Sequence, residues 1–375
     1  MSLPLVRLSG SAYEQGLAHG EALRERIATN LQLYFDRFRR EARLTRDETL
    51  GMAGRLLDVV RASDPGYASG IEGIAAGSGF DVLEIAALNV RYEILYYQFG
   101  INATLDAQHL TDGIEPPAQV TDGCTSFAVL PEAMATGHLT IGQNWDWIPA
   151  VRGAVLHTVE EDGLETVAFT EAGIFGGKLG MNSAGLGLCI NGLTTTTDDW
   201  ARPVSPVHVR TRRILRSRRF EDAVSVVRNE ARACAVNLLV AQAPDRAVDL
   251  EAAPDVVRQL ECEGGCVVHA NHFLDPAGMG ISEPPNERRP HSYNRQRRMR
   301  ELLESRQPLA IADLQDFLRD HEDYPDSICR HPNPADPDEE HYATVTAVIM
   351  DLEERRMLIT DGNPDESEFQ EFKLG

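Results

Sequence analysis

The pattern of apolar residues changes abruptly at Cys124. Over residues 11–100 apolar side chains recur every three or four positions, as in "GLAHGEALRERIATNLQLYFDRFRREARL", which predicts amphipathic helices. Beyond Cys124, short apolar and β-branched runs such as "CTSFAVLP" and "HLTIGQNWDW" are separated by Gly and Pro, which predicts strands. Helices are expected again near 207–230 and 291–305. Such a chain is expected to form a layered α+β domain, with its helical first third packed around the sheets.

Composition excludes several classes of protein. The chain has 375 residues, with 36 basic and 58 acidic side chains and a net charge of −22. Such an acidic balance argues against nucleic acid or an anionic membrane as the main partner. Six irregularly spaced cysteines do not resemble a disulfide framework, and the first residues lack the apolar segment of a signal peptide. We therefore expect a cytoplasmic protein without a membrane span.

Cys124 lies where a polar linker, residues 101–123, meets the first predicted strand. A structural thiol is usually buried within an element, whereas a thiol at a strand entrance is well placed to react. No histidine lies near it in sequence to act as its base. Cleavage between Gly123 and Cys124 would supply a base, because a free α-amino group has a pKa of about 8. The alternative is an ordinary cysteine at a strand entrance.

The segment "GQNWDW" is the second candidate. Strand alternation places Gln143, Trp145 and Trp147 on one face, and Asn144 and Asp146 on the other. Polar groups beside two tryptophans indicate the wall of a pocket. An edge strand with its polar face in solvent explains the pattern equally well.

The segment "CEGGCVVHANHF" contains potential metal ligands, namely Cys262, Cys266, His269 and His272. The two ligand pairs are much closer in sequence than those of a zinc finger, and an extended strand would point the two histidines to opposite faces. A turn at "EGG" between two strands is the simpler interpretation, with Asn271 near a strand end. We expect neither a metal site nor a cofactor.

Arg330 lies in the Pro-rich segment "EDYPDSICRHPNP". Its guanidinium group offers paired donors that match a carboxylate. Taken alone, an ordinary surface arginine is the simpler interpretation.

Taken together, these segments resemble the acyl-coenzyme A:isopenicillin N (6-aminopenicillanic acid) acyltransferase family, a branch of the cysteine N-terminal-nucleophile hydrolases. The resemblance extends in order along nearly the whole chain. Its blocks are "GSAYEQGLAHG", "DVLEIAALNVRYE", "DGCTS", "GQNWDW", "TEAGIFGGKLGMNSAGLGLCIN", "VHANHF", "YNRQRRM" and "DYPDSICR". The most specific part is "DGCTS" followed about twenty residues later by "GQNWD".

The resemblance implies a four-layer αββα sandwich made as a precursor that cuts itself before the cysteine. Cys124 matches the nucleophile and Gly123 the residue whose carbonyl is attacked. Asp146 matches a pocket aspartate, Asn271 the oxyanion-hole asparagine, and Arg330 a substrate-binding arginine.

Two positions depart from the fungal pattern. Ser126 replaces a threonine and keeps a hydroxyl for processing. Trp147 replaces a phenylalanine, and if this larger ring lines the acyl pocket, the identity of the acyl group stays open. The chain closes with "FQEFKLG", without a peroxisomal signal, so a bacterial cytoplasmic relative is expected.

The expected activity is that of a self-processing cysteine amidohydrolase or acyltransferase acting on acyl amides or acyl-coenzyme A through a thioester. Residues 1–123 and 124–375 would become two associated fragments of one domain. Two alternatives stay open. One is hydrolysis of bile-salt or N-acylethanolamine amides, and the other is an unprocessed binding protein without catalysis.

Overall fold

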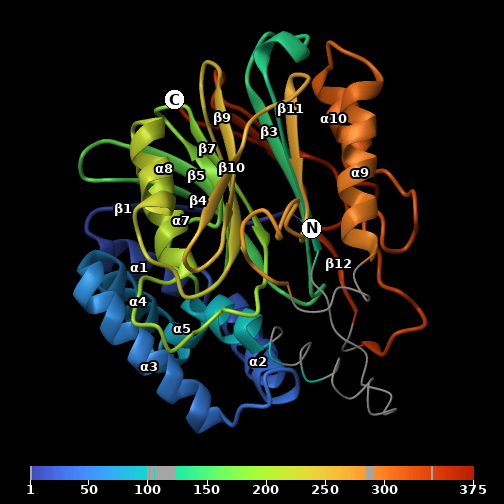
Figure 1. Cartoon of the computed structure of the whole chain (residues 1–375). Helices are drawn as coiled ribbons and strands as arrows, with labels where there is room; N and C mark the ends of the chain where they lie inside the picture. The colour runs from blue at the N-terminus through green and yellow to red at the C-terminus, as the bar shows by residue number, and fades with distance from the viewer. Residues whose placement is uncertain (1, 99–100, 102–104, 106–122, 284–289, 339–340) are drawn as a thin grey trace.

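The computed structural model describes residues 2–98, 101, 105, 123–283, 290–338 and 341–375. The predicted linker at 101–123 lies almost entirely outside these residues. Figure 1 shows two sheets packed face to face, with helices on both outer sides.

The larger sheet has eight strands. In spatial order they are β1 (Leu5–Ser9), β4 (Gly153–Val159), β5 (Glu165–Glu171), β6 (Leu179–Asn182), β7 (Leu186–Gly192), β8 (Val236–Gln242), β9 (Arg246–Ala252) and β10 (Val257–Leu260). β1 pairs with β4 in parallel, and the other neighbours are antiparallel.

The smaller sheet has six antiparallel strands. In spatial order they are β11 (Cys266–His269), β2 (Gly123–Val129), β3 (Thr140–Trp147), β12 (Ala343–Asp351), β13 (Arg356–Ile359) and β14 (Gln370–Lys373). β2 and β3 are buried on both faces, because one face meets the larger sheet and the other meets helices. Buried strands of this kind lack clean apolar–polar alternation.

Helices form the two outer layers. Those over the larger sheet are α7 (Val207–Leu215) and α8 (Phe220–Arg228), and those over the smaller sheet are α9 (Pro290–Ser305) and α10 (Ile311–Leu318). A second apolar core fills the space under α9 and α10, where Met299 and Leu314 pack near Phe127. The four-layer αββα sandwich expected from the resemblance is confirmed.

The N-terminal segment packs against one end of the sandwich (Figure 1). Its helices are α1 (Ala12–Ala22), α2 (Arg24–Arg40), α3 (Arg46–Ser63), α4 (Pro65–Ser78) and α5 (Val82–Asn89), and helical backbone continues over 91–98. Ser11 and Glu14, whose spacing in the sequence matches a capping box, form one at the start of α1. α1 and α4 lie so close that a Cβ on Gly73 would stand 2.2 Å from the Tyr13 carbonyl oxygen. The main core draws residues from this segment and from both sheets.

Several boundaries differ from the sequence-based expectations. The stretch 207–230 holds two helices rather than one, with a break over 216–219. No strand was expected before Cys124, yet β1 is an edge strand of the larger sheet. Its five residues form a strand because β4 supplies its hydrogen bonds, which a short local pattern does not reveal. The strands β9, β10 and β14 and the helix α10 were also not anticipated.

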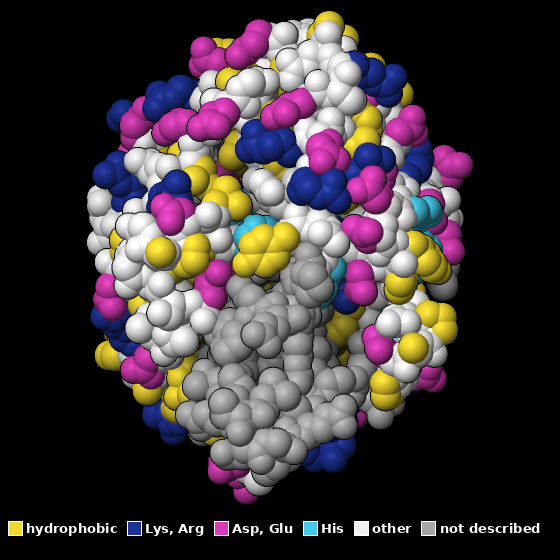
Figure 2. Space-filling view, turned by 45° about the vertical axis from the view of Figure 1, so that its right-hand side comes forward, with side chains coloured by type: hydrophobic (Ala, Val, Ile, Leu, Met, Phe, Trp, Pro, Cys, Tyr) yellow, Lys and Arg dark blue, Asp and Glu magenta, His cyan; other side chains and the backbone are white. Residues whose placement is uncertain are grey.

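Acidic and basic side chains are interspersed over the described part of the face shown in Figure 2. Within the described ranges, no helix combines the length and apolar character needed to cross a membrane.

Candidate active site

Cys124 is the second residue of β2, which lies between β11 and β3 in the smaller sheet, and it pairs with Trp145 of β3. Cys124 is only 2% exposed. The thiol therefore lies at the entrance of the strand, as the sequence predicts, but it is buried. The Cys124 backbone N–H donates a hydrogen bond of 2.7 Å to Oδ1 of Asn271, which follows β11. The structure therefore brings together two predicted site residues that are 147 positions apart.

Arg295 of α9 completes this arrangement. Its Nη1 donates to the Cys124 carbonyl and, at 2.9 Å, to Oγ1 of Thr125. Its Nη2 donates to Asn271 Oδ1 at 3.0 Å. Asn271 Nδ2 in turn donates to the Gly192 carbonyl at 3.1 Å. The start of β2 is thus held by an amide and a buried guanidinium group.

Arg295 belongs to the block "YNRQRRM", but sequence reasoning assigned it no role. A signal was present, because Arg295, Met299 and Leu303 lie at spacings of four residues on one helix face. Both apolar members of this set are fully buried, and Arg295 is 1% exposed. An arginine on the apolar face of a helix needs a buried partner.

Gly123 faces Asp146 across the β2–β3 pair. A Cβ at Gly123 would lie 2.6 Å from Asp146 Oδ2, so only glycine fits beside this carboxylate. Asp146 is fully buried, and its Oδ1 accepts a hydrogen bond of 2.7 Å from Thr344 Oγ1 in β12. The edge-strand alternative for "GQNWDW" is wrong, because β3 lies between β2 and β12.

Ser126 lies on the face of β2 that meets the larger sheet. Its hydroxyl donates to Asn191 Oδ1 in β7 at 2.7 Å. On β3, the neighbouring side chain of Gln143 donates to the Ile190 carbonyl at 2.5 Å and accepts from the Ile190 N–H at 2.9 Å. The two sheets are therefore joined by polar contacts beside the site as well as by apolar packing.

A buried group of charges lies on the same side. Glu171 of β5 binds Arg91 and, at 3.1 Å, the Lys178 ammonium group. Burial alone would raise the pKa of Glu171, but the two cations outweigh it and hold the pKa at about 2. Burial lowers the pKa of Lys178 to about 7, although Glu171 and a Cys124 thiolate both favour its charged form.

Lys178 is one of only two lysines in the chain, and sequence reasoning overlooked it. Its Nζ lies 3.2 Å from the ring centroid of Trp145, which is the cross-strand partner of Cys124. A cation that interacts with the thiolate and titrates near neutrality is a functional candidate.

Trp147 is buried between the strands and the N-terminal helices. Its Nε1 donates to the Tyr34 hydroxyl at 2.7 Å. The guanidinium groups of Arg37 and Arg91 lie over its ring at 4.6 and 5.0 Å from the centroid. Its ring is thus fixed on several sides by groups from the first third of the chain.

Arg330 lies in the loop before β12, and its side chain is 10% exposed. Its Nη2 pairs with Asp326 at 2.6 Å. Its backbone N–H donates to Thr344 Oγ1 at 2.9 Å, and this hydroxyl also contacts Asp146. The loop of Arg330 is therefore connected to the buried aspartate through a single threonine.

Three of the four potential ligands in "CEGGCVVHANHF" contact separate partners. His269 Nε2 contacts Glu251 at 3.0 Å, His272 Nδ1 contacts the Ser292 hydroxyl at 2.8 Å, and Cys266 contacts the Glu263 carbonyl. The expectation that the two histidines point apart is wrong. Because β11 ends at His269, the chain bends, and the rings lie roughly parallel with centroids 6.4 Å apart.

A four-layer αββα sandwich with a cysteine at the start of a central strand is the arrangement of cysteine N-terminal-nucleophile hydrolases. The family model for acyl-coenzyme A:6-aminopenicillanic acid acyltransferase matches residues 134–366, more than half of the chain. The chain belongs to this family. The match includes Asp146, Asn271 and Arg330 and begins ten residues after Cys124.

Similarity to individual proteins extends over most of the chain. The chain is 29% identical over 330 residues to the acyl-coenzyme A:6-aminopenicillanic-acid-acyltransferase 40 kDa form of Emericella nidulans, covering 87% of this chain and 84% of that protein. Among solved structures, the Caenorhabditis elegans ortholog of N-acylethanolamine-hydrolyzing acid amidase aligns with a TM-score of 0.43 at 14% identity, over 61% of this chain and 93% of that one. Penicillin V acylase from Agrobacterium tumefaciens aligns with a TM-score of 0.41 at 15% identity, over 64% and 83%.

The buried position of Lys178 predicts a specific pH dependence. Its pKa is about 7 in the fold and 10.5 in a model peptide, so between these values the unfolded chain binds more protons. The free energy of unfolding of the wild type should therefore rise with pH relative to Lys178→Met, by up to about 1.4 kcal/mol per pH unit. Urea unfolding at pH 7, 8 and 9 measures this difference.

The control is Lys373→Met, which removes the other lysine from a half-exposed site beside Glu354. This variant should follow the slope of the wild type. Equal slopes for Lys178→Met and the wild type would show that Lys178 keeps its proton through this range.

Proposed function

We propose that the protein is a self-processing cysteine amidohydrolase or acyltransferase of the cytoplasm. The observation that carries the proposal is the hydrogen bond between the Cys124 N–H and Asn271, made where Arg295 also binds the Cys124 carbonyl. Asn271 thus binds the peptide unit whose cleavage would create a reactive N-terminus, and Arg295 binds the next peptide unit along the chain. All six cysteines lie in the described residues and none forms a disulfide, which suits a reducing compartment.

Processing would begin with the Cys124 thiol. The sulfur adds to the Gly123 carbonyl carbon, and the C–N bond between the two residues breaks as the thioester forms. The Cys124 nitrogen takes up a proton and becomes an amine. Water then hydrolyses the thioester, which leaves a carboxylate on Gly123 and regenerates the thiol. The absence of a Cβ on Gly123 lets its backbone lie beside the Asp146 carboxylate.

In the mature enzyme the new α-amino group would act as the base for the thiol. Asn271 Oδ1 already accepts from this nitrogen and would hold the amine in place. The thiol then attacks an acyl amide or acyl thioester to form a thioester acyl-enzyme. The Asn271 amide has a second N–H besides the one that binds Gly192, and this donor would stabilise the oxyanion. Water or an amine finally takes the acyl group.

The two fragments would remain associated. β1 of the first fragment pairs with β4 of the second, and the main core draws on both. Trp147 of the second fragment would line the acyl pocket, and its hydrogen bond to Tyr34 of the first fragment would hold its ring in place. The N-terminal fragment is thus proposed as a permanent partner of the catalytic one.

Hydrolysis and transfer differ only in the final acceptor. Acyl amides of bile-salt or N-acylethanolamine type are alternative substrates. Product analysis with a panel of acyl amides and acyl-coenzyme A donors distinguishes amide hydrolysis from acyl transfer. A binding protein that never processes is the remaining alternative, and it would leave Cys124 unlabelled by thiol reagents.

The first prediction from this mechanism concerns processing. Purified wild type should contain two chains, of 123 and 252 residues from the total of 375, because cleavage falls after Gly123. Cys124→Ala should give one uncut, inactive chain, whereas Cys262→Ala, which removes a half-buried thiol elsewhere, should process normally. Intact mass and denaturing electrophoresis measure this. Full activity from an uncut wild-type chain would refute the assignment of the α-amino base.

The second prediction concerns the oxyanion. Asn271→Ala should lower kcat by roughly a hundredfold or more, as loss of one oxyanion donor typically does. Asn271→Asp keeps an acceptor for the Cys124 nitrogen but has no amide donor, so it should be equally impaired once processed. Near-normal turnover of processed Asn271→Asp would mean that the side chain only positions the amine.

The third prediction concerns substrate charge. Asp146 and Arg330 suggest recognition of an amine and a carboxylate, with the substrate carboxylate replacing Asp326 beside Arg330. Arg330→Lys should lower kcat/KM for acyl-amino acids about tenfold or more, because lysine lacks the paired donors. Uncharged acyl amides should be unaffected, and Arg319→Lys serves as a surface control. An equal loss for both substrate classes would contradict carboxylate recognition.

A further inference from the structure

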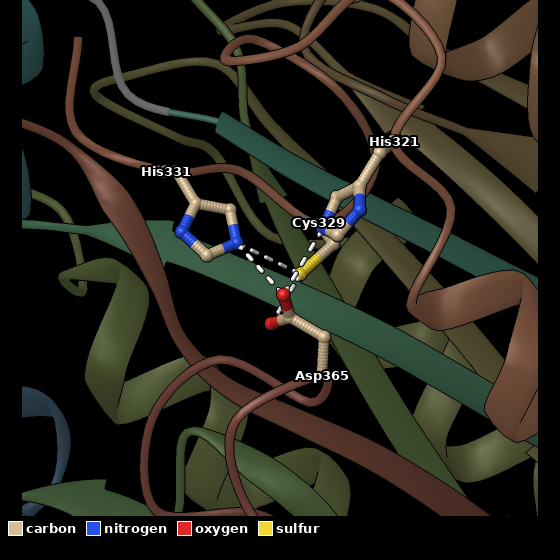
Figure 3. Close-up of side chains that lie close together, drawn as sticks. All are labelled: His321, Cys329, His331 and Asp365. Carbon is tan, nitrogen blue, oxygen red and sulfur yellow. Dashed lines mark hydrogen bonds and ion pairs between the residues drawn. The ribbon is translucent and has the colours of Figure 1, made fainter.

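Four side chains with metal-binding atoms converge in the loops around Arg330. His321 follows α10, Cys329 and His331 flank Arg330, and Asp365 lies between β13 and β14. Figure 3 shows all four functional groups pointing toward one another. One ligand atom from each lies within 4.8 Å of every other, and no second group of this kind occurs in the described part of the chain.

Four distances between these groups are near those of a tetrahedral metal site. The distances are 3.1 Å from Cys329 Sγ to Asp365 Oδ1 and 3.8 Å from the same sulfur to His331 Nε2. Asp365 Oδ2 lies 3.1 Å from His331 Nε2 and 3.2 Å from His321 Nε2. Ligands at usual zinc bond lengths lie roughly 3.3–3.6 Å from one another in a tetrahedron. Small shifts would therefore place all four around one ion.

We propose that His321, Cys329, His331 and Asp365 bind a zinc ion. One thiolate, one carboxylate and two neutral imidazoles give a donor set that zinc accepts, and the two negative charges neutralise Zn²⁺. Ordinary surface ion pairs account for the two histidines beside Asp365. They do not account for Cys329, which is fully buried and directs its sulfur at the same carboxylate.

Surrounding groups support the arrangement. Asn363 Nδ2 lies 3.7 Å from Cys329 Sγ and donates to the Arg330 carbonyl at 2.7 Å. The side chains of His331 and Asp365 are 13% and 23% exposed, whereas His321 is 42% exposed and closes the site from solvent. Four protein ligands leave no position for a reacting water, so the site is structural rather than hydrolytic.

The ion would fix the loop that carries Arg330. Both neighbours of Arg330 would be metal ligands, and its backbone N–H binds the Thr344 hydroxyl that contacts Asp146. Bound zinc would thereby tie the loop between β13 and β14 to the loop that approaches the buried aspartate. This consequence for substrate binding rests on the proposed function, whereas zinc binding does not.

The test measures zinc directly. Full-length protein is dialysed against a chelator, titrated with zinc sulfate in competition with a chromophoric chelator, and separately loaded with Co²⁺. The wild type should bind one zinc per chain, and its Co²⁺ form should show tetrahedral d–d bands and a sulfur-to-cobalt charge-transfer band. Cys329→Ser should lose the sulfur band and bind zinc at least about a hundredfold more weakly. Cys262→Ser, which removes a thiol outside the group, should match the wild type.

His321→Ala provides a second variant, because this most exposed ligand is not needed to fill the core. It should remain folded by circular dichroism and bind zinc at least about tenfold more weakly. Equal zinc affinity in wild type, Cys329→Ser and His321→Ala would overturn the proposal, as would a folded wild type that takes up no zinc. Cys124→Ala should bind zinc like the wild type whether or not the chain processes, which separates this proposal from the proposed function.

Discussion

The hydrogen bonds that Asn271 Oδ1 accepts from Cys124 and Arg295 hold the first residues of β2 in place. They join three elements, since β2, the segment after β11 and helix α9 meet at this one oxygen. Neither donor nor acceptor contacts bulk water, so an unmade hydrogen bond here would cost roughly 1–3 kcal/mol, and more for the guanidinium group. The position of the thiol in the sheet, and of the peptide bond before it, follows from this constraint.

Buried charge imposes a second constraint on the architecture. Glu171 lies between the larger sheet and the N-terminal helices, and its buried carboxylate is tolerable because both Arg91 and Lys178 bind it. Removing one partner of such a group typically costs on the order of 3–5 kcal/mol, because the remaining charge stays buried. The helical first third therefore does more than cover apolar surface. It supplies Arg91, a positive counter-charge for Glu171 of the larger sheet. This pair lies beside Lys178 and close to the Cys124 thiol.

Polar bridges extend these constraints to the opposite side of the smaller sheet. Asp146 faces Gly123 on one strand and accepts from Thr344 on the next, and Thr344 accepts from the Arg330 backbone. Segments separated by nearly 200 residues are thus connected through two side chains. The group formed by His321, Cys329, His331 and Asp365 lies at the outer end of this connection.

Local sequence pattern by itself determined much of this protein. The change from helical to strand periodicity at Cys124 and the capping box at Ser11 indicated the layered fold. The motif blocks, through their resemblance to the acyltransferase family, pointed to Cys124, Asp146 and Asn271. Periodicity and turn chemistry reflect interactions between residues close in sequence, and these are what such patterns can predict. Only the tertiary structure decided that β3 is central, that β1 joins the larger sheet, and that Arg295, Lys178 and the four potential zinc ligands have close partners. Each of these depends on contacts between distant segments, where burial and pairing are set by neighbours that the local sequence does not contain.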